Sequence, residues 1–257
     1  MVLITSAFWR DRLKASAIHL GLSLAIAALA AFLVFGIWYP YPYRELSGGR
    51  ELFLLVVTVD VILGPLITLA VFNRAKPLPE LRRDLVIVVL IQLAALVYGL
   101  WTVSAARPVH LVFEYDRFRV VHAIDVPLEL LDKTPPGVKA LPWTGPTLLA
   151  LREFKDGQEK MDATLAAMQG VSLSSRPDLW RPYAPAVPDI LLAARPVPEL
   201  QARFPARAQE ISQLLAATGR NPQTLRYLPL VGRKEFWTVF LDPVTAEIVA
   251  TLPLDPY

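Results

Sequence analysis

The stretch from Leu52 to Phe72 constrains this chain more than any other, because it reads LFLLVVTVDVILGPLITLAVF and is almost entirely apolar. At about 1.5 Å of rise per residue, a helix of this length reaches roughly 30 Å, enough to cross a bilayer. Its one ionisable residue, Asp60, falls near the middle, where a carboxylate costs about 2.5–3.5 kcal/mol on insertion scales. We therefore expect Asp60 to face a partner, a protein interior or water. Gly64 and Pro65 follow one turn later, and the missing N–H of proline predicts a bend with freed carbonyl groups.

Two further apolar runs accompany this stretch, so the sequence predicts three transmembrane helices at about 15–38, 52–72 and 85–103. The first run continues past Ala31, which is too long for a cleaved signal peptide and favours a retained anchor. Basic residues precede the first run and fill the loop between the second and third runs. By the positive-inside rule, both segments are expected in the cytoplasm and the C-terminal part on the other side of the membrane.

The composition agrees with a membrane protein, since 54% of the residues are hydrophobic. The formal net charge is +3, but the residues from Arg107 onward are neutral in sum, so the basic excess belongs to the membrane region. This distribution indicates membrane topology and argues against nucleic acid as a partner. The chain has no cysteine, which excludes disulfides, thiolate nucleophiles and Cys-ligated metals.

Residues 107–257 follow the membrane region 1–106 without a linker, and they are numerous enough to form one core. Alternating β-branched and aromatic residues predict strands at 109–116, 117–126, 225–231, 235–241 and 247–252. Because two isolated strands are marginal in water, we expect the first two strands to join the last three in one sheet. The sequence therefore predicts a small extracytoplasmic α+β domain with an antiparallel sheet.

Helices are predicted between the two groups of strands. Residues 147–155 and 159–168 read as short helices, with Leu165 and Met168 among the expected core residues, and residues 205–218 read as a further helix.

The predicted C-terminal domain offers no catalytic constellation. His110 and His122 lie on predicted strands without a metal-ligand spacing, and the serines at 172, 174 and 175 lack a nucleophile motif. No glycine-rich phosphate loop is present in the sequence. We expect no enzymatic activity, no cofactor and no metal site.

Asp60 is the residue for which the sequence offers most alternatives. Counted by depth in the membrane, Gln92 and Tyr98 of the third helix lie closest to it and could donate an internal hydrogen bond. A second interpretation makes Asp60 a docking charge for a membrane segment that carries a positive group, with Gly64 and Pro65 shaping the contact. A proton or ion pathway is the third. His19 is expected deeper in the membrane, as a packed or snorkelling residue.

Small residues recur on one face of the first helix, at Ala17, Gly21 and Ala25. Such a face lets helix backbones approach closely in lipid. It predicts either packing against the second or third helix of this chain or a contact with a foreign helix.

Several sequence blocks resemble the TfpX/TfpZ family of type IV pilin accessory proteins. They are KASAIHLGLSLAIA, WYPYPYRELSGGRELFLLVVTVDVILGPLITLAVFN, QLAALVYGLWTVSAARPVHLVFEYDRF and, at the C-terminal end, FLDPVTAEIVATLPLD. The resemblance is close over about residues 14–125 and looser beyond them. It implies a Gram-negative inner-membrane protein that assists a particular pilin in stability, assembly or pilus dynamics, and it implies no catalytic residues.

Residue patterns and resemblance together predict a non-enzymatic, chaperone-like accessory protein. Its helices would engage the apolar segment of type IV pilin in the lipid bilayer, and its periplasmic domain would contact the pilin head or the assembly machinery. The alternative is a membrane-anchored sensor or binding subunit whose outer domain recognises a small ligand or a cell-wall component.

Overall fold

The computed structural model describes residues 6–257, so the first five residues of the predicted membrane region lie outside it. The chain divides into two compact units. One contains the long helices up to Ile37 and from Gly49 to Ala105, and the other contains residues 38–48 together with 106–257.

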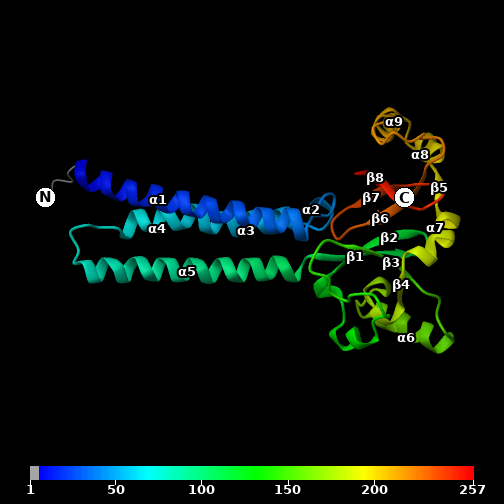
Figure 1. Cartoon of the computed structure of the whole chain (residues 1–257), viewed down its shortest axis with the longest axis horizontal. Coiled ribbons are helices and arrows are strands. Elements are labelled where there is room, and N and C mark those ends of the chain that lie inside the picture. The colour runs from blue at the N-terminus through cyan, green and yellow to red at the C-terminus, as the bar shows by residue number, and fades with distance from the viewer. Residues whose placement is uncertain (1–5) are drawn as a thin grey trace. The chain divides into compact units, whose positions relative to one another are not determined.

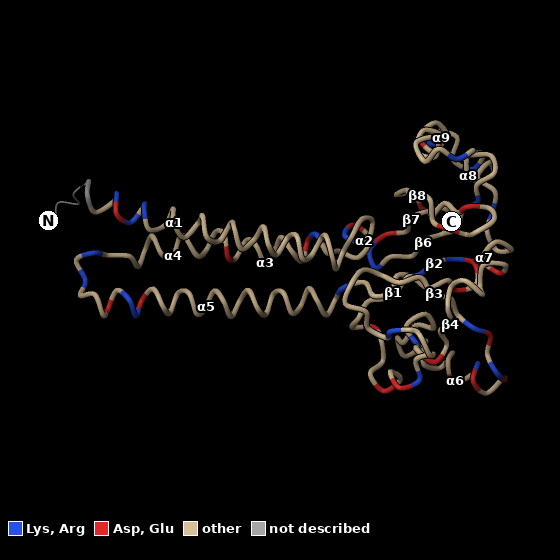
Figure 2. The backbone as a smooth tube through the Cα atoms, viewed as in Figure 1, with Lys and Arg blue, Asp and Glu red and all other residues tan. Residues whose placement is uncertain are grey.

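Three long apolar helices form the first unit, as predicted, and each is long enough to span a membrane. They comprise α1 (Ser6–Ala31) with a π-helical continuation (Phe32–Trp38), α3 (Gly49–Thr58) joined by a π-helical segment (Val59–Leu63) to α4 (Gly64–Val71), and α5 (Leu78–Ala105). Most of their apolar side chains point outward, as helices surrounded by lipid require. Lys and Arg gather at the start of α1 and around the α4–α5 loop (Figure 2).

One mixed sheet organises the second unit (Figure 1). Its strands are β1 (Pro108–Glu114), β2 (Arg117–His122), β3 (Thr147–Leu151), β4 (Trp180–Pro182), β5 (Arg195–Pro196), β6 (Arg226–Val231), β7 (Phe236–Leu241) and β8 (Ile248–Leu252). Their order is β4-β3-β1-β2-β6-β7-β8, with β5 on β6. The predicted hairpin therefore lies beside the predicted meander and the α+β class is confirmed. The sheet is mixed rather than antiparallel, because β3 runs parallel to β1 and β6 parallel to β2.

Apolar clusters cover both faces of the sheet. The helices are α6 (Gly157–Met168), α7 (Val187–Ala193), α8 (Val197–Arg203) and α9 (Ala208–Ala216). Leu111 and Phe113 pack with Val239 on one face, while Val112 belongs to a cluster on the other. Val109 joins Val112 rather than Leu111, because a register shift between Pro108 and His110 breaks the alternation that the sequence suggested.

The segment 38–48 is part of this domain and not a free loop between helices. It contains the short helix α2 (Tyr43–Leu46), whose Leu46 is fully buried in the main core cluster with Trp237. The N–H of Lys234 donates to the Leu46 carbonyl at 3.2 Å. Gly232 is required beneath it, since a Cβ atom there would lie 2.7 Å from the same carbonyl oxygen. The sequence alone assigns these residues to the membrane region 1–106, because they lie between two apolar runs.

Two sequence-based assignments in the domain are wrong. Residues 147–151 form the strand β3, not a helix, because they hydrogen-bond in register with β1 and β4 on both sides. Tertiary pairing here overrides the helix preference of Leu and Ala. Leu165 and Met168, expected in the core, are exposed on α6, and it is Ala163 that faces inward.

Candidate functional site

The middle span carries an irregular turn where Asp60 lies. Residues Val59–Leu63 are π-helical, directly before Gly64 and Pro65. Because proline has no N–H, the Asp60 carbonyl five residues earlier finds no donor in such a turn. Instead, Nε2 of Gln92 on α5 donates to that carbonyl at 3.3 Å. Gly64 leaves room for the amide, since a Cβ atom there would lie 1.8 Å from Gln92 Nε2.

The Asp60 side chain is buried, with 8% of the residue exposed. Its Oδ1 atom has no hydrogen-bond partner within residues 6–257. The internal hydrogen bond from Gln92 or Tyr98, one of the three interpretations of Asp60, is therefore not made to Oδ1. Gln92 reaches the backbone of Asp60 instead, and Tyr98 is 68% exposed, with its ring against Trp101 at a centroid distance of 5.9 Å.

Helix α1 contributes polar contacts that the sequence alone did not reveal. The Ser16 hydroxyl donates to the Pro65 carbonyl at 2.9 Å. Nδ1 of His19 shares a hydrogen bond with the Thr68 hydroxyl at 2.5 Å, with the donor set by the histidine tautomer. His19 is thus a packed residue, one of the two possibilities considered for it. The helical spacing of Ser16 and His19 could have indicated this face, but their partners on α4 could not be read from it.

The small residues of α1 lie elsewhere. Ala17, Gly21 and Ala25 are exposed, and a Cβ atom added to Gly21 would meet no atom within 4 Å. Packing of this face against the chain's own helices is therefore wrong. The buried residues of α1 include Ser23 and Ala30, on a different face.

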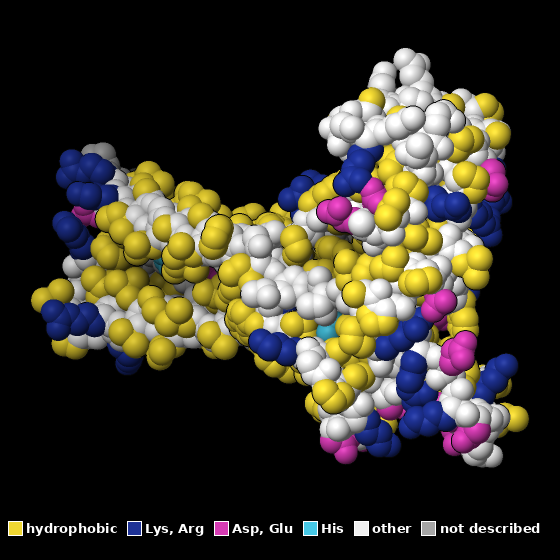
Figure 3. Space-filling model, turned by 45° about the vertical axis from the view of Figure 1, so that its right-hand side comes forward, with side chains coloured by type: hydrophobic (Ala, Val, Ile, Leu, Met, Phe, Trp, Pro, Cys, Tyr) yellow, Lys and Arg dark blue, Asp and Glu magenta, His cyan; other side chains and the backbone are white. Residues whose placement is uncertain are grey.

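A groove runs between α1 and α5, with the middle helix as its floor (Figure 3). Its volume is about 430 Å³. Asp60 and Thr68 contribute from the middle helix, His19 and Ser23 from α1, and Gln92 from α5. The rest of the lining is apolar: Ala15, Ile18, Leu22, Ile26, Phe72, Leu85, Val89, Leu93 and Leu96. The lining extends from Leu85 to Leu96 on α5, or about 16 Å at roughly 1.5 Å per residue, so the groove is long enough for several turns of a helix.

The groove combines an apolar wall with an acidic floor. A carboxylate kept away from water and without a hydrogen bond to one oxygen is costly. A guest that brings a donor or a positive charge to that oxygen would remove part of this cost. The arrangement can therefore recognise a largely apolar segment that carries one polar or cationic group.

The C-terminal domain holds polar clusters whose contacts are structural. His110 bonds to the Thr147 hydroxyl at 2.6 Å and to the Ala140 carbonyl at 2.9 Å, and burial lowers its pKa to about 4. His122 contacts Asp125, and the serines 172, 174 and 175 hydrogen-bond one another. Over residues 6–257, no group of His, Cys, Asp or Glu side chains is arranged to hold a metal ion.

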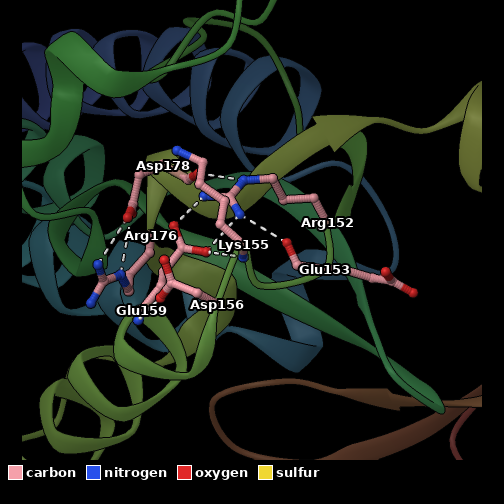
Figure 4. A network of polar contacts seen from close by, with 7 residues as sticks. All are labelled: Arg152, Glu153, Lys155, Asp156, Glu159, Arg176 and Asp178. Atoms are coloured by element: carbon pink, nitrogen blue, oxygen red, sulfur yellow. Dashed lines mark hydrogen bonds and ion pairs between the residues drawn. The ribbon is translucent and has the colours of Figure 1, made fainter.

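A further polar network fastens α6 to the end of β3 (Figure 4). Arg152 donates to both carboxylate oxygens of Glu159, at 2.6 and 2.8 Å, and to the Asp178 carbonyl at 3.0 Å. Asp156 caps α6 by accepting from the Glu159 N–H at 2.8 Å. The hydrogen bond from Arg152 is the main cause that lowers the pKa of Glu159 to about 2. These contacts give the charged side chains a structural role, because they hold α6 against the end of β3.

Comparison with known proteins identifies the family. The profile of the family described as "Fimbrial assembly protein FimB" matches residues 7–48. The fimbrial assembly protein of serogroup I from Dichelobacter nodosus is 37% identical over 231 residues, which cover 89% of this chain and 90% of that protein. Its serogroup E1 counterpart is 35% identical over the same shares of both chains. No solved structure matches the chain significantly. Since these relatives align over most of both chains, this protein belongs to the FimB family of fimbrial assembly proteins.

Proposed function

We propose that this protein is a non-enzymatic accessory factor of type IV fimbrial assembly that holds a pilin in the membrane by non-covalent contacts. The relatives, named fimbrial assembly proteins, support the role in assembly. The resemblance to the TfpX/TfpZ family supports a pilin as the client. The observation that carries the proposal is the groove between α1 and α5, which is long, mostly apolar, and has Asp60 on its floor.

The same proposal includes a topology. The protein lies in the bacterial inner membrane, with the N-terminus in the cytoplasm and the C-terminal domain in the periplasm. Basic residues at the start of α1 and around the α4–α5 loop support this orientation (Figure 2). A reporter fused after Asn73 should then be active in the cytoplasm, and one fused at Tyr257 in the periplasm. Periplasmic activity at Asn73 would overturn the orientation.

Within the groove, Asp60 is proposed to pair with a positive group of the pilin segment. The resemblance to the TfpX/TfpZ family implies a pilin as the client. Processed type IV pilins enter the membrane with a positively charged N-terminus, which would supply such a group. The Asp60 Oδ1 atom, buried and without a partner in the described chain, is the acceptor on offer. The exposed small residues Ala17, Gly21 and Ala25 provide a second apolar surface where a helix could approach closely, outside the groove.

Two substitutions separate docking from a bracing role. Asp60→Asn keeps the shape but removes the charge, and Asp60→Leu removes both. Neither change removes the Gln92 bond, because that bond goes to the Asp60 backbone. Both variants should insert and accumulate normally yet lose pilin capture in a co-purification assay. Normal piliation and capture with Asp60→Asn would exclude charge pairing at this site.

Photo-crosslinking locates the client. A crosslinking residue placed at Leu22 or Val89, on the groove walls, should give a pilin adduct. The matched control is Leu29, which is exposed on α1 but does not line the groove. Equal adduct yields at all three positions would contradict the groove as the binding site.

A further inference from the structure

The segment 123–143 of the C-terminal domain is held by hydrogen bonds to Arg107, two residues after the third span. Arg107 lies just beyond the end of α5 at Ala105. Its carbonyl accepts from the Ala123 N–H at 2.9 Å, and its Nη2 donates to the Pro142 carbonyl at 3.2 Å. Both ends of the segment are therefore held at a point that covalent continuity places close to the membrane surface.

The first span contributes a second fixed point. Trp38 is the last residue of that span and belongs to the same compact unit as the segment. The Trp143 ring packs edge-on against it, with centroids 5.3 Å apart, while the Arg107 guanidinium lies 5.8 Å from the Trp143 ring centre. Trp143 thus contacts residues next to the ends of two spans.

The segment has one apolar side turned inward and another turned outward. Val126, Leu131 and Val138 pack in the cluster on one face of the sheet. Leu128 is 73% exposed and Trp143 is 59% exposed despite its contacts. Large apolar side chains that remain exposed beside a membrane surface have lipid as their nearest apolar neighbour, and tryptophan favours the headgroup level.

The charges of the segment do not favour an anionic surface. Asp125 is paired with Arg233 at 2.7 Å. The remaining charged side chains, Glu129, Asp132, Lys133 and Lys139, cancel in sum. Attraction to the membrane must therefore come from apolar burial rather than from charge.

We propose that segment 123–143 is a membrane-contact surface, with Leu128, Trp143 and the neighbouring exposed Ile124 seated at the headgroup–acyl boundary of the bilayer from which the domain emerges. This surface would fix the domain beside the ends of its spans. It is independent of the groove and of the pilin proposal.

Spin labels test the proposal directly, because the chain has no native cysteine. Full-length Leu128→Cys, Ile124→Cys and Trp143→Cys variants carry a nitroxide in phosphatidylcholine vesicles. The matched control is Tyr115→Cys: Tyr115 is an aromatic residue with 58% exposure. It lies beyond the opposite end of β1, about 26 Å from Arg107 for eight residues at roughly 3.3 Å each. Collision rates with oxygen and with a water-soluble nickel chelate are then compared by electron paramagnetic resonance.

The oxygen-to-nickel ratio should be several-fold higher at 124, 128 and 143 than at 115, without any anionic lipid. Ratios at all three positions equal to that at 115 would overturn the proposal. Labels that are nickel-accessible in pure vesicles but shielded in native membranes would also overturn it, because a protein would then cover the surface. Leu128→Cys and Ile124→Cys change exposed side chains, so the test still works if Trp143→Cys disturbs the folding of the domain.

Discussion

The two units of this protein distribute apolar and polar residues in opposite ways. The C-terminal domain buries its large aliphatic and aromatic residues in clusters on both faces of its sheet, whereas the helical unit exposes most of its leucines and isoleucines. Among the side chains buried in the helical unit are Asp60, Thr68 and Ser23. In lipid, apolar burial does not hold helices together, so close packing and polar contacts must do so. The domain is therefore stabilised by its apolar core, whereas the helices depend on a few polar groups, which under the proposed function also provide recognition.

The largest difference should appear when a leucine is truncated in each unit. Leu46→Ala removes a fully buried side chain from the domain core, which costs about 2–5 kcal/mol of unfolding free energy. Leu54→Ala removes a leucine from the outer face of α3, and the domain should unfold as in the wild type. Denaturant unfolding of the full-length protein, followed by domain fluorescence, measures both. Equal shifts would mean that the segment 38–48 is not part of the folded core.

The next largest effect is a loss of unfolding free energy of the domain at low pH. His110 is neutral in the folded domain because burial lowers its pKa to about 4. Above a pH of about 6.5 the ring is neutral in both states, and the domain keeps its full stability. Between about pH 6.5 and 4 the unfolded chain takes up a proton that the folded chain refuses, so up to about 3 kcal/mol is lost as the pH falls. Unfolding midpoints at several pH values test this, with His110→Gln as a control that lacks this component. An identical pH profile for that variant would contradict the assignment.

Two glycines of the helical unit, Gly99 and Gly21, differ in the space around them. A Cβ atom at Gly99 would lie 2.6 Å from Val56 Cγ2, so Gly99→Ala should overpack the α3–α5 contact by about 1–3 kcal/mol. Gly21→Ala meets no atom within 4 Å, and it should be neutral or stabilise α1 by up to about 1 kcal/mol. Detergent-induced unfolding of the helices distinguishes the two variants. A penalty for Gly21→Ala as large as that for Gly99→Ala would show that the exposed face of α1 is packed after all.

The smallest effect belongs to the surface network of the domain. Glu159→Gln weakens the contact with Arg152 and should cost about 1 kcal/mol or less, since ion pairs that water still reaches contribute little. The carboxylate of Glu153 points away from this network, so Glu153→Gln is the matched control (Figure 4). Because the pKa of Glu159 is lowered to about 2, its contribution is fully present above about pH 4.5 and is lost as the pH falls through about 2. A thermal melt that does not distinguish the two variants at neutral pH would show that the network adds no stability.

The sequence was informative wherever a local pattern determines the structure. The three spans follow from apolar length, and the hairpin and meander follow from alternating residues closed by turns. Asp60 stands out for the same reason, because a lone acid within an apolar run is itself a local pattern.

The errors arose where the structure depends on rotation or on distant pairing. In a helix that is apolar all round, hydrophobicity does not determine which face meets the neighbour. The stripe at Ala17, Gly21 and Ala25 therefore fits an inward or an outward face equally well, and in the structure it is exposed. Depth alone makes Tyr98 a candidate partner of Asp60, but depth does not determine the direction in which a side chain points. The strand β3 could not be distinguished from a helix without knowing that β1 and β4 flank it.

The position of Leu46 beneath the turn between β6 and β7 has a consequence for the order of events during synthesis. The ribosome makes the segment 38–48 early, but its partners Gly232 and Lys234 emerge only after almost all of the remaining chain. The core cannot close before then, so the domain cannot complete its folding progressively from its N-terminal side. A growing chain must keep the segment 38–48, with its core residue Leu46, uncovered until the last hairpin arrives. If translation stalls before β6, the truncated product would therefore leave this segment exposed and accessible to proteases.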